Sequence, residues 1–287
     1  MSSAVLAVGL ALLSALLFAA ASAAQQSVAE DVPQERAQGL AFLRVLVTQP
    51  RWWAGVLGDG GGYLVQAAAL SVGSLLLVAP LLVASLLFAL PISAALTRRR
   101  LSGRTVLLAS VLTAALAAFL VLGRPDEGLD SAPLRQWLIA LVPAAVAACA
   151  CVVWARLASG ATRALLFGTA AGVCFGMSAP LTKAIVAVGA DNLLALPLAW
   201  QTWALVVTGA GGFYLQQFAF QSGDISASLP ALIVAEPLVA ALCGSVVFNE
   251  RLRVHGAQWA LIAACVLVMI TTTVGLARSQ AASEARA

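Results

Sequence analysis

The sequence predicts an all-α membrane protein with about nine transmembrane helices, and three observations carry that prediction. Of the 287 residues, 62% are hydrophobic and only 10% are charged, whereas soluble domains are about 45–50% apolar and about 25% charged. The mean hydropathy is +0.98. The apolar residues form continuous runs rich in Ala and Leu, whereas the strands of a membrane barrel would alternate polar and apolar residues.

Nine runs are long enough to cross a hydrocarbon core of about 30 Å, which takes about 20 mostly apolar residues in a helix. Their approximate limits are 4–24, 52–72, 75–97, 104–122, 133–155, 164–188, 198–221, 227–248 and 257–277. The seven tryptophans lie near the ends of these runs, where amphipathic rings prefer the membrane interface. Ala21-Ser22-Ala23 resembles a signal-peptidase site, but residues 1–20 contain no Lys or Arg. A retained first span is therefore favoured over a cleaved one.

The segment 25–51 is too polar to cross the membrane, because it holds four charged residues between positions 30 and 36. Its apolar stretch is short and is interrupted by Arg44, which predicts an amphipathic helix in the membrane interface. A re-entrant segment over 38–50 is the alternative.

Basic residues gather on one side of the predicted membrane and indicate the orientation. One side holds Arg36, Arg44, Arg51, Arg98, Arg99, Arg100, Arg104, Arg156, Arg163, Arg278 and Arg286. The other side holds Arg124, Arg135, Lys183, Arg251 and Arg253. Because cytoplasmic loops carry the excess of Lys and Arg, the N-terminus is expected outside and the C-terminus inside.

An internal repeat is the most informative pattern in the chain. A shift of 150 residues aligns 53–80 with 203–230 and gives nine identities in 28 positions, against about three expected from the biased composition. The identities include the pairs Trp53/Trp203, Gly62/Gly212, Gln66/Gln216 and Pro80/Pro230. The two copies are the second and the seventh predicted spans, and this odd offset of five means that the second copy is expected to be inverted in the membrane.

Inverted repeats are the architecture of many secondary transporters, whose substrate sites lie at the repeat interface near the bilayer midplane. The expected division is a first repeat over 1–130, a linking span over 131–160, a second repeat over 161–278 and a disordered tail over 279–287. A channel or an inert scaffold built from the same repeat is the alternative.

Several motifs carry a family likeness. The second half has a Gly-rich sixth span that ends in Lys183, the run Gly211 to Gly223, Pro230, Glu236-Pro237 and Phe248-Asn249-Glu250-Arg251-Leu252. In these it resembles the EamA-like branch of the drug/metabolite transporter (DMT) superfamily. The first half has Trp52-Trp53-Ala54-Gly55, Gly62, Gln66 and Pro80, and in these it is similar to NIPA-type magnesium transporters. The resemblance implies small-solute transport by alternating access.

Two positions depart from the magnesium-transporter pattern. Tyr63 stands where that family tends to have a Glu, and Arg98-Arg99-Arg100 replaces an acidic residue after the third span. Mg²⁺ prefers hard oxygen ligands, so these departures favour another solute.

Glu236 is the main candidate for a site residue, because an ionisable side chain in the middle of a span is costly and usually functional. Proton coupling or cation binding is one interpretation. The other is a protonated carboxyl that bonds a carbonyl freed by Pro237 at a helix kink. Asp59, beside Gly58 and the run 60–62, is expected either to line an inner vestibule or to face water at a frayed helix.

The remaining candidates are Lys183 and three amides. Lys183 is the only lysine; an anion clamp or a partner for Glu236 is one interpretation, and a stem that extends to the interface is the other. The repeat-related Gln66 and Gln216, with Gln217 next to the latter, are expected either to line the substrate path or to bridge helices by hydrogen bonds.

The sequence predicts no enzyme, cofactor or metal site. The glycine runs 60–62 and 209–212 lack the preceding strand and the following Lys-Ser/Thr of a phosphate loop. The expected partners are the lipid bilayer and a small-molecule or ion substrate, not nucleic acid, and a homodimer stays open. The first hypothesis is a secondary carrier in the cytoplasmic membrane. The alternatives are a pathway for Mg²⁺ or another cation, and a lipid or isoprenoid flippase or non-transporting membrane protein.

Overall fold

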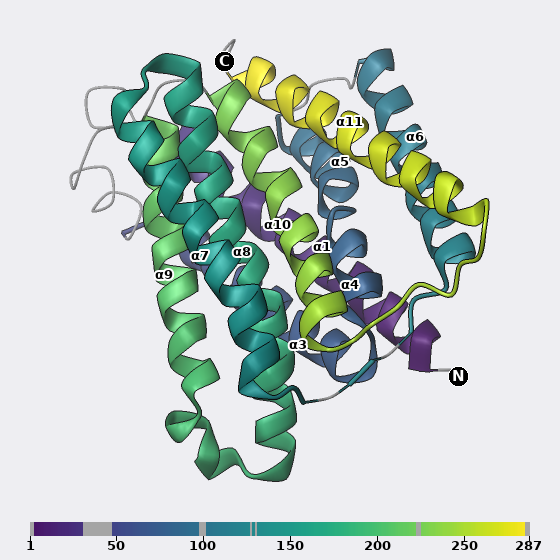
Figure 1. The fold of residues 1–287 in the computed structure, drawn as a ribbon. Coiled ribbons are helices and arrows are strands. Elements are labelled where there is room, and N and C mark those ends of the chain that lie inside the picture. Colours follow the sequence, from purple (N-terminus) through teal and green to yellow (C-terminus); the bar gives the residue numbers. More distant parts are fainter. Residues whose placement is uncertain are drawn as a thin grey trace.

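The computed structural model describes residues 3–30, 48–97, 102–126, 128–129, 131–221 and 225–284. Helices make up nearly all of this part of the chain (Figure 1). In chain order they are α1 (Ser3–Glu30), α3 (Pro50–Val72), α4 (Leu75–Leu82), α5 (Ser85–Thr97), α6 (Gly103–Gly123), α7 (Leu134–Leu157), α8 (Gly160–Asp191), η2 (Leu193–Leu198), α9 (Trp200–Gln221), α10 (Ile225–Val247) and α11 (Gln258–Glu284).

Six stretches of the described helices are long and apolar enough to cross a membrane. They are Ser3–Ala21, Gly103–Gly123, Leu134–Leu157, Gly160–Asp191, Pro230–Val247 and Gln258–Leu276. The chain is therefore consistent with the multi-pass helical membrane protein that its composition predicts. The other three predicted spans coincide with α3, α4–α5 and α9. Glycines and glutamines dilute the apolar content of α3 and α9, and α3 also carries Asp59.

The predicted span 75–97 is divided into two helices. The Val83 N–H bonds the Pro80 carbonyl at 3.2 Å and the Ala84 N–H bonds the Leu81 carbonyl at 2.9 Å, which is the tighter pattern of a 3₁₀ turn. Pro80 lies inside α4 and has no N–H to donate to the carbonyl four residues earlier. The helix is therefore weakened just before the division.

The predicted interfacial segment 25–51 and the predicted disordered tail 279–287 have different outcomes. Of the expected interfacial segment 25–51, residues 25–30 continue α1 and 50–51 begin α3, whereas 31–47 lie outside the described residues. The tail expected over 279–287 is helical as far as Glu284, because α11 extends to that residue. Four of the six residues that follow Arg278 in the helix are Ala, Gln or Glu, and these residues favour continuation of the helix.

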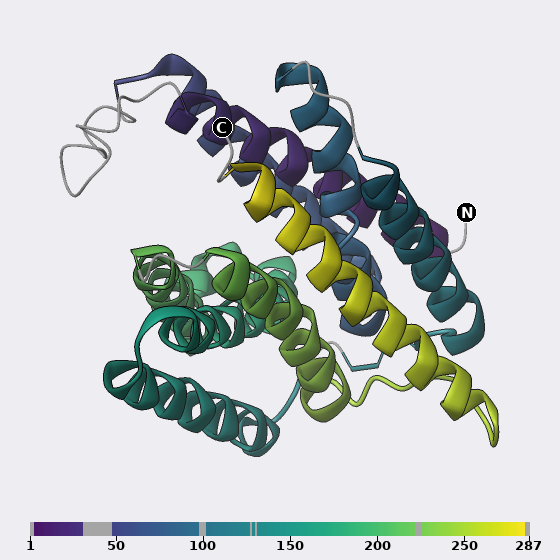
Figure 2. The same cartoon turned by 90° about the horizontal axis from the view of Figure 1, so that it is seen from above.

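The helices form two groups when the molecule is seen from above (Figure 2). Helices α1, α3, α4, α5 and α6 form one group, in which α1 packs against α3, α4 and α5. Helices α7, α8, α9 and α10 form the other, in which α8 packs against the other three. The last helix, α11, packs along both α6 and α10, so it links the second group to the first.

Three glycines spaced four residues apart on α8 bring α10 close. A Cβ atom added at Gly172 would lie 2.6 Å from the Leu232 carbonyl oxygen, and one at Gly176 would lie 2.6 Å from the Glu236 carbonyl oxygen. Gly168 faces the α10 backbone in the same way. Small residues let helix backbones approach closely in membranes. This row of glycines therefore holds the backbone of Glu236 against α8.

Two glycines that the sequence repeat pairs also make equivalent contacts. A Cβ atom at Gly62 on α3 would lie 2.9 Å from the Phe18 ring of α1. A Cβ atom at Gly212 on α9 would lie 2.9 Å from the Phe175 ring of α8. Each half of the chain thus packs a pair of antiparallel neighbours through one glycine and one phenylalanine ring.

Candidate functional site

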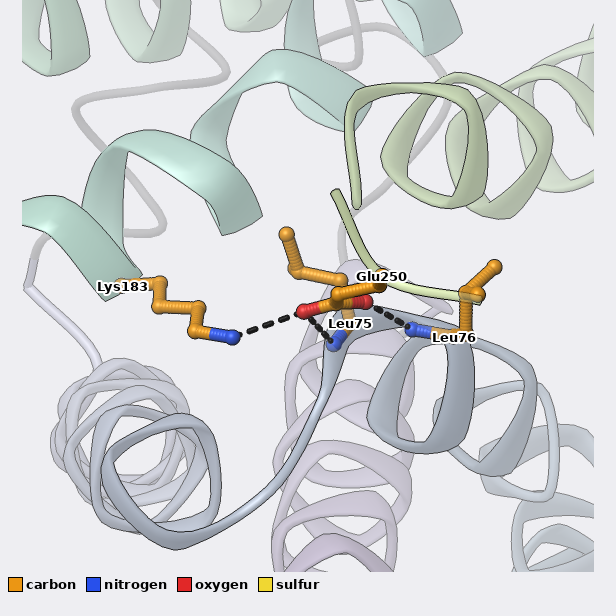
Figure 3. Close-up of polar contacts among 4 residues, drawn as sticks. All are labelled: Leu75, Leu76, Lys183 and Glu250. Carbon is orange, nitrogen blue, oxygen red and sulfur yellow. Dashed lines mark hydrogen bonds and ion pairs between the residues drawn. The ribbon is translucent and has the colours of Figure 1, made fainter. Parts of the chain in front are cut away.

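A buried ion pair lies at one end of the bundle (Figure 3). The Lys183 Nζ atom on α8 lies 2.7 Å from Oε1 of Glu250, which follows the end of α10. The Glu250 carboxylate also accepts hydrogen bonds from the backbone N–H groups of Leu75 and Leu76, each at 2.9 Å. The side chains of Lys183 and Glu250 are 6% and 0% exposed. These four residues are called the Glu250 cluster.

The Glu250 cluster provides hydrogen-bond acceptors for the first backbone N–H groups of α4. The first N–H groups of a helix have no partner within it, and the preceding Ser74 makes no side-chain capping bond here. Glu250 supplies that cap from a segment 175 residues away. The positive end of the helix dipole favours a carboxylate at this place, and Lys183 balances the charge that remains. The cluster thus ties α4 of the first group to α8 and the α10–α11 loop of the second.

Two glycines make room for Glu250. A Cβ atom at Gly244 would lie 2.6 Å from Glu250 Oε2, and one at Gly128 would lie 2.6 Å from Glu250 Cγ. Gly128 also has φ +67°, a conformation that glycine adopts without steric cost. Both positions therefore require the absence of a side chain.

The loops that follow α6 and α10 lie side by side at this end. The Asp126 N–H bonds the Arg251 carbonyl and the Arg253 N–H bonds the Gly123 carbonyl, each at 2.9 Å. An exposed ion pair between Arg253 and Asp126 at 2.7 Å lies over the same contact. The two halves are therefore joined by backbone bonds beside the Glu250 cluster.

Aromatic rings pack around the Lys183–Glu250 ion pair at this end of the bundle. The Lys183 Nζ atom lies 4.8 Å from the centroid of the Phe248 ring, a distance at which a cation and a ring attract. Trp137, at the start of α7, contacts Phe248 and Trp200 edge to face, at 5.8 Å and 5.3 Å between ring centroids. Both Trp137 and Phe248 are buried, so packed side chains fill the space around the ion pair.

A cavity of about 680 Å³ lies between the two helix groups. Residues of α1, α3, α4 and α5 line it from the first group, and residues of α8, α9 and α10 line it from the second. We call it the central cavity. Most of its wall is apolar. Its polar side chains are Asp59, Tyr63, Gln66, Ser85, Ser178, Gln216 and Glu236.

Glu236 lines the central cavity from α10. The next residue, Pro237, has no N–H to donate, so the carbonyl of Ile233 lacks its usual helical partner. Within the described part of the chain, neither a hydrogen bond nor an ion pair reaches the Glu236 carboxyl group. The ionised form of such a group is costly away from water, so a proton or a cation is needed to compensate it.

The two repeat-related glutamines line the same cavity from opposite groups. Gln66 lies on α3 and is 7% exposed, and Gln216 lies on α9. Neither amide has a hydrogen-bond partner among the described residues. Helix bridging, the alternative interpretation for these amides, therefore has no described contact to support it. Both amides are available to a solute in the cavity.

Tyr63 on α3 and Thr182 on α8 join the two groups by a hydrogen bond between their hydroxyl groups. Thr182 in turn donates to the Ser178 carbonyl of its own helix at 2.7 Å. Tyr63 is therefore held in place on the wall of the cavity, which Gln66 also lines from the same helix.

Asp59 lies where the central cavity meets a more open hollow of about 760 Å³ on α1 and α3. Phe18, Asp59 and Tyr63 line both spaces. Asp59 precedes the end of α3 by 13 residues, which corresponds to about 20 Å along a helix. It therefore lies toward the end of the molecule opposite to the Glu250 cluster. A place beside an open hollow is compatible with the expectation that Asp59 lines a vestibule.

Lys183 and Gln217, which were also predicted as site residues, are not among the described residues that line the central cavity. Lys183 does not line the central cavity, and its partner is Glu250 rather than Glu236. It is also too deeply buried, at 5% exposure, to extend to the interface. Lys183 is therefore neither a partner of Glu236 nor a side chain that reaches the interface, and the anion clamp stays a prediction. Gln217 belongs to α9, but its side chain lies outside the described part of the chain.

Sequence reasoning missed four residues of this region. Glu250 appeared only as part of a family-like motif, although a lone acidic residue beside a buried span was a usable signal. The rings of Phe18, Tyr63 and Phe175 line the central cavity, and no periodicity distinguished them from lipid-facing aromatics. The paired glycines Gly62 and Gly212 were a signal for the two phenylalanines, because a small residue repeated in both halves leaves space for a ring.

Comparison with known proteins places the chain in one family. It is 34% identical over 281 residues to the uncharacterized protein Cgl0250/cg0304 of Corynebacterium glutamicum, and the match covers 97% of each chain. No protein-family profile matches the sequence. No solved structure matches it either. The resemblance to the DMT superfamily therefore stays a prediction. Identity at this level over nearly the whole of both chains shows common descent, and the chain belongs to the family of Cgl0250/cg0304.

Proposed function

We propose that the protein is a secondary transporter, which moves a small metabolite or drug-like solute across the cytoplasmic membrane by alternating access and couples this movement to protons through Glu236. One observation carries the proposal: Glu236, Gln66 and Gln216, from α10, α3 and α9, line one cavity between the two groups of helices. Secondary transporters with inverted repeats bind their substrates at this place.

The directions of α3 and α9 support the inverted repeat. The N–H groups just after the end of α3 bond Glu250, which follows the end of α10. Trp200, the first residue of α9, lies in the aromatic group around Phe248 at this same end of α10. The end of α3 thus lies near the start of α9, which supports the proposal that the two repeat copies run in opposite senses.

The Glu250 cluster supports a carrier that is closed at one end. Lys183, Glu250 and the surrounding rings fill the bundle beyond the central cavity, whereas Asp59 leads from the cavity to an open hollow. The orientation expected from the arginines places the closed end outside and the Asp59 end toward the cytoplasm. In this proposal the structure is an inward-facing state, and opening outward requires the cluster to separate.

Proton coupling is assigned to Glu236 because its carboxyl group is the one in the cavity with no described partner. The other titratable side chains that line the cavity are Asp59 and Tyr63, both on α3. The elements α1, α4, α5, α8 and α9 contribute no titratable side chain to the described lining. Exchange of a proton for a solute at Glu236 then links the two movements.

A pair of glycine substitutions tests the role of the cavity. Gly209 on α9 lines the central cavity, and Gly9 is an exposed residue of α1; a Cβ atom at either position meets nothing within 4 Å. We expect Gly209→Phe to fill the cavity without a backbone clash and to abolish solute-dependent proton movement, while Gly9→Phe retains it. The measurement is the signal of a trapped pH dye in proteoliposomes exposed to pools of amines, amino acids and organic acids. Equal proton movement in the two variants, or none with any pool in the unmodified protein, contradicts the proposal.

A further inference from the structure

We propose that the central cavity takes an organic cation, namely an amine with an apolar or aromatic body, as the transported solute. This inference rests on the proposed function and names its substrate class. It depends on the charge, the rings and the amides of the cavity wall.

The charge of the wall is one-sided. Glu236 and Asp59 contribute carboxyl groups, and none of the described lining residues is Lys, Arg or His. Lys183, the only lysine, is committed to Glu250. Asp59 has an interaction of its own, so the argument depends on Glu236. A positively charged solute compensates this carboxylate, whereas an anion would meet it without any basic side chain on the described wall.

Three aromatic rings line the same space. Phe18 and Phe175 contact the repeat-related Gly62 and Gly212, and Tyr63 on α3 is joined to Thr182 of the other group. An ammonium group within about 6 Å of a ring face is attracted to it, and the attraction is stronger when the group is desolvated. The rings also pack against the apolar body of a solute. A cation that carries an apolar body therefore uses both properties of the wall.

The buried amide of Gln66 is the independent observation that points to a ligand. It is 7% exposed, lines the cavity and has no partner among the described residues. Buried polar groups are almost always hydrogen-bonded, so a ligand or water completes this site. Its carbonyl oxygen and that of Gln216 accept from an ammonium N–H, which adds direction to the charge attraction.

The same wall suits an inorganic cation less well. Magnesium is bound through a near-octahedral set of oxygen atoms, and in the described chain no three His, Cys, Asp or Glu side chains come together as a metal group. The volume of about 680 Å³ falls in the range of about 300–1,000 Å³ that holds drug-sized ligands. A hydrated ion would leave the rings and most of the apolar wall without a contact.

A set of four compounds with one indole ring tests the charge class. Tryptamine is a cation at neutral pH, tryptophol is neutral, tryptophan is a zwitterion and indole-3-acetate is an anion. The purified full-length protein is assayed for saturable binding of tritiated tryptamine and for displacement by the other three. We expect displacement by the other three to require concentrations higher by about tenfold or more. Tryptophol and indole-3-acetate lack the ammonium group, and tryptophan keeps it but adds a carboxylate that Glu236 repels.

Two kinds of variant assign that preference to the wall. Glu236→Gln is expected to bind tryptamine no better than tryptophol, whereas Asp191→Asn, at the exposed end of α8, keeps the preference. If Glu236→Gln does not fold, Phe18→Leu combined with Phe175→Leu replaces it, and the preference for tryptamine over tryptophol is expected to fall about fivefold. Tryptophol or indole-3-acetate binding as tightly as tryptamine overturns the proposal, as does the absence of saturable tryptamine binding.

Uptake of the same four compounds into proteoliposomes separates this inference from the proposed function. Saturable uptake of tryptamine supports both. If tryptophan or indole-3-acetate is taken up and tryptamine is not, the carrier stands and the cation class is wrong. If tryptamine binds but none of the four compounds moves, the cation site stands and the transport function is wrong.

Discussion

Replacing Glu236 with glutamine is expected to reduce solute uptake driven by a pH gradient to the level of empty liposomes. Glutamine has nearly the same size and keeps one oxygen that accepts hydrogen bonds, but it cannot ionise. In the unmodified protein, uptake of a cationic solute should increase as the pH on the solute side rises, because the ionised carboxylate binds the cation and the protonated one does not. Uptake by the variant should lose this dependence. The measurement is initial uptake across a series of pH values in proteoliposomes.

Asp191→Asn is the matched control for that experiment, because it makes the same change of an acid to an amide at an exposed helix end. It is expected to keep the pH dependence. If Glu236→Gln keeps it as well, the coupling group is another one. Asp59 and Tyr63, which share the cavity wall, are then the residues to replace.

The second large effect is expected on stability, from Glu250→Ala. This change leaves the buried Lys183 ammonium without its carboxylate and leaves the N–H groups of Leu75 and Leu76 without a cap. Removing one partner of a buried pair typically costs about 3–5 kcal/mol. We expect a loss of that size in the free energy of unfolding, measured by titration with denaturing detergent in mixed micelles.

A double variant and a surface pair provide the controls. Lys183→Met combined with Glu250→Gln removes both charges, so it should cost less than Glu250→Ala, because no buried charge remains unpaired. Asp126→Ala removes the exposed pair with Arg253, whose side chains are 47% and 66% exposed, and should cost about 0–1 kcal/mol. If Glu250→Ala costs no more than Asp126→Ala, the Glu250 cluster does not hold the two halves together.

The membrane class and the helix positions could be predicted from the sequence because a bilayer imposes a simple rule on apolar length. The run 164–188 lies within α8 and the run 227–248 nearly coincides with α10. The division of 75–97 could not be predicted. Pro80 weakens α4 and Pro237 weakens α10 in the same way, yet α10 is unbroken. Whether a proline divides its helix depends on packing partners that are distant in the chain.

The candidate site was predictable to the extent that it follows from the cost of polar groups in lipid. That argument selected Glu236 and the pair Gln66 and Gln216, which line one cavity in the structure. The argument failed for Lys183, because its partner Glu250 is 67 residues away and lies in a loop that hydropathy assigns to water. A contact between a span and a loop leaves no periodic trace, so only the fold reveals it.

In the proposed transport cycle, the cavity between the two halves opens to each side of the membrane in turn. The most direct measurement is the reaction of Ser178→Cys, a small change on the cavity wall, with an impermeant thiol reagent after the five native cysteines are replaced. Right-side-out and inside-out vesicles are compared. We expect faster reaction from the cytoplasmic side, and a gain in reaction from the outer side when Lys183→Met and Glu250→Gln are added. Absence of reaction from either side, or an outer rate that loosening the Glu250 cluster leaves unchanged, would contradict it.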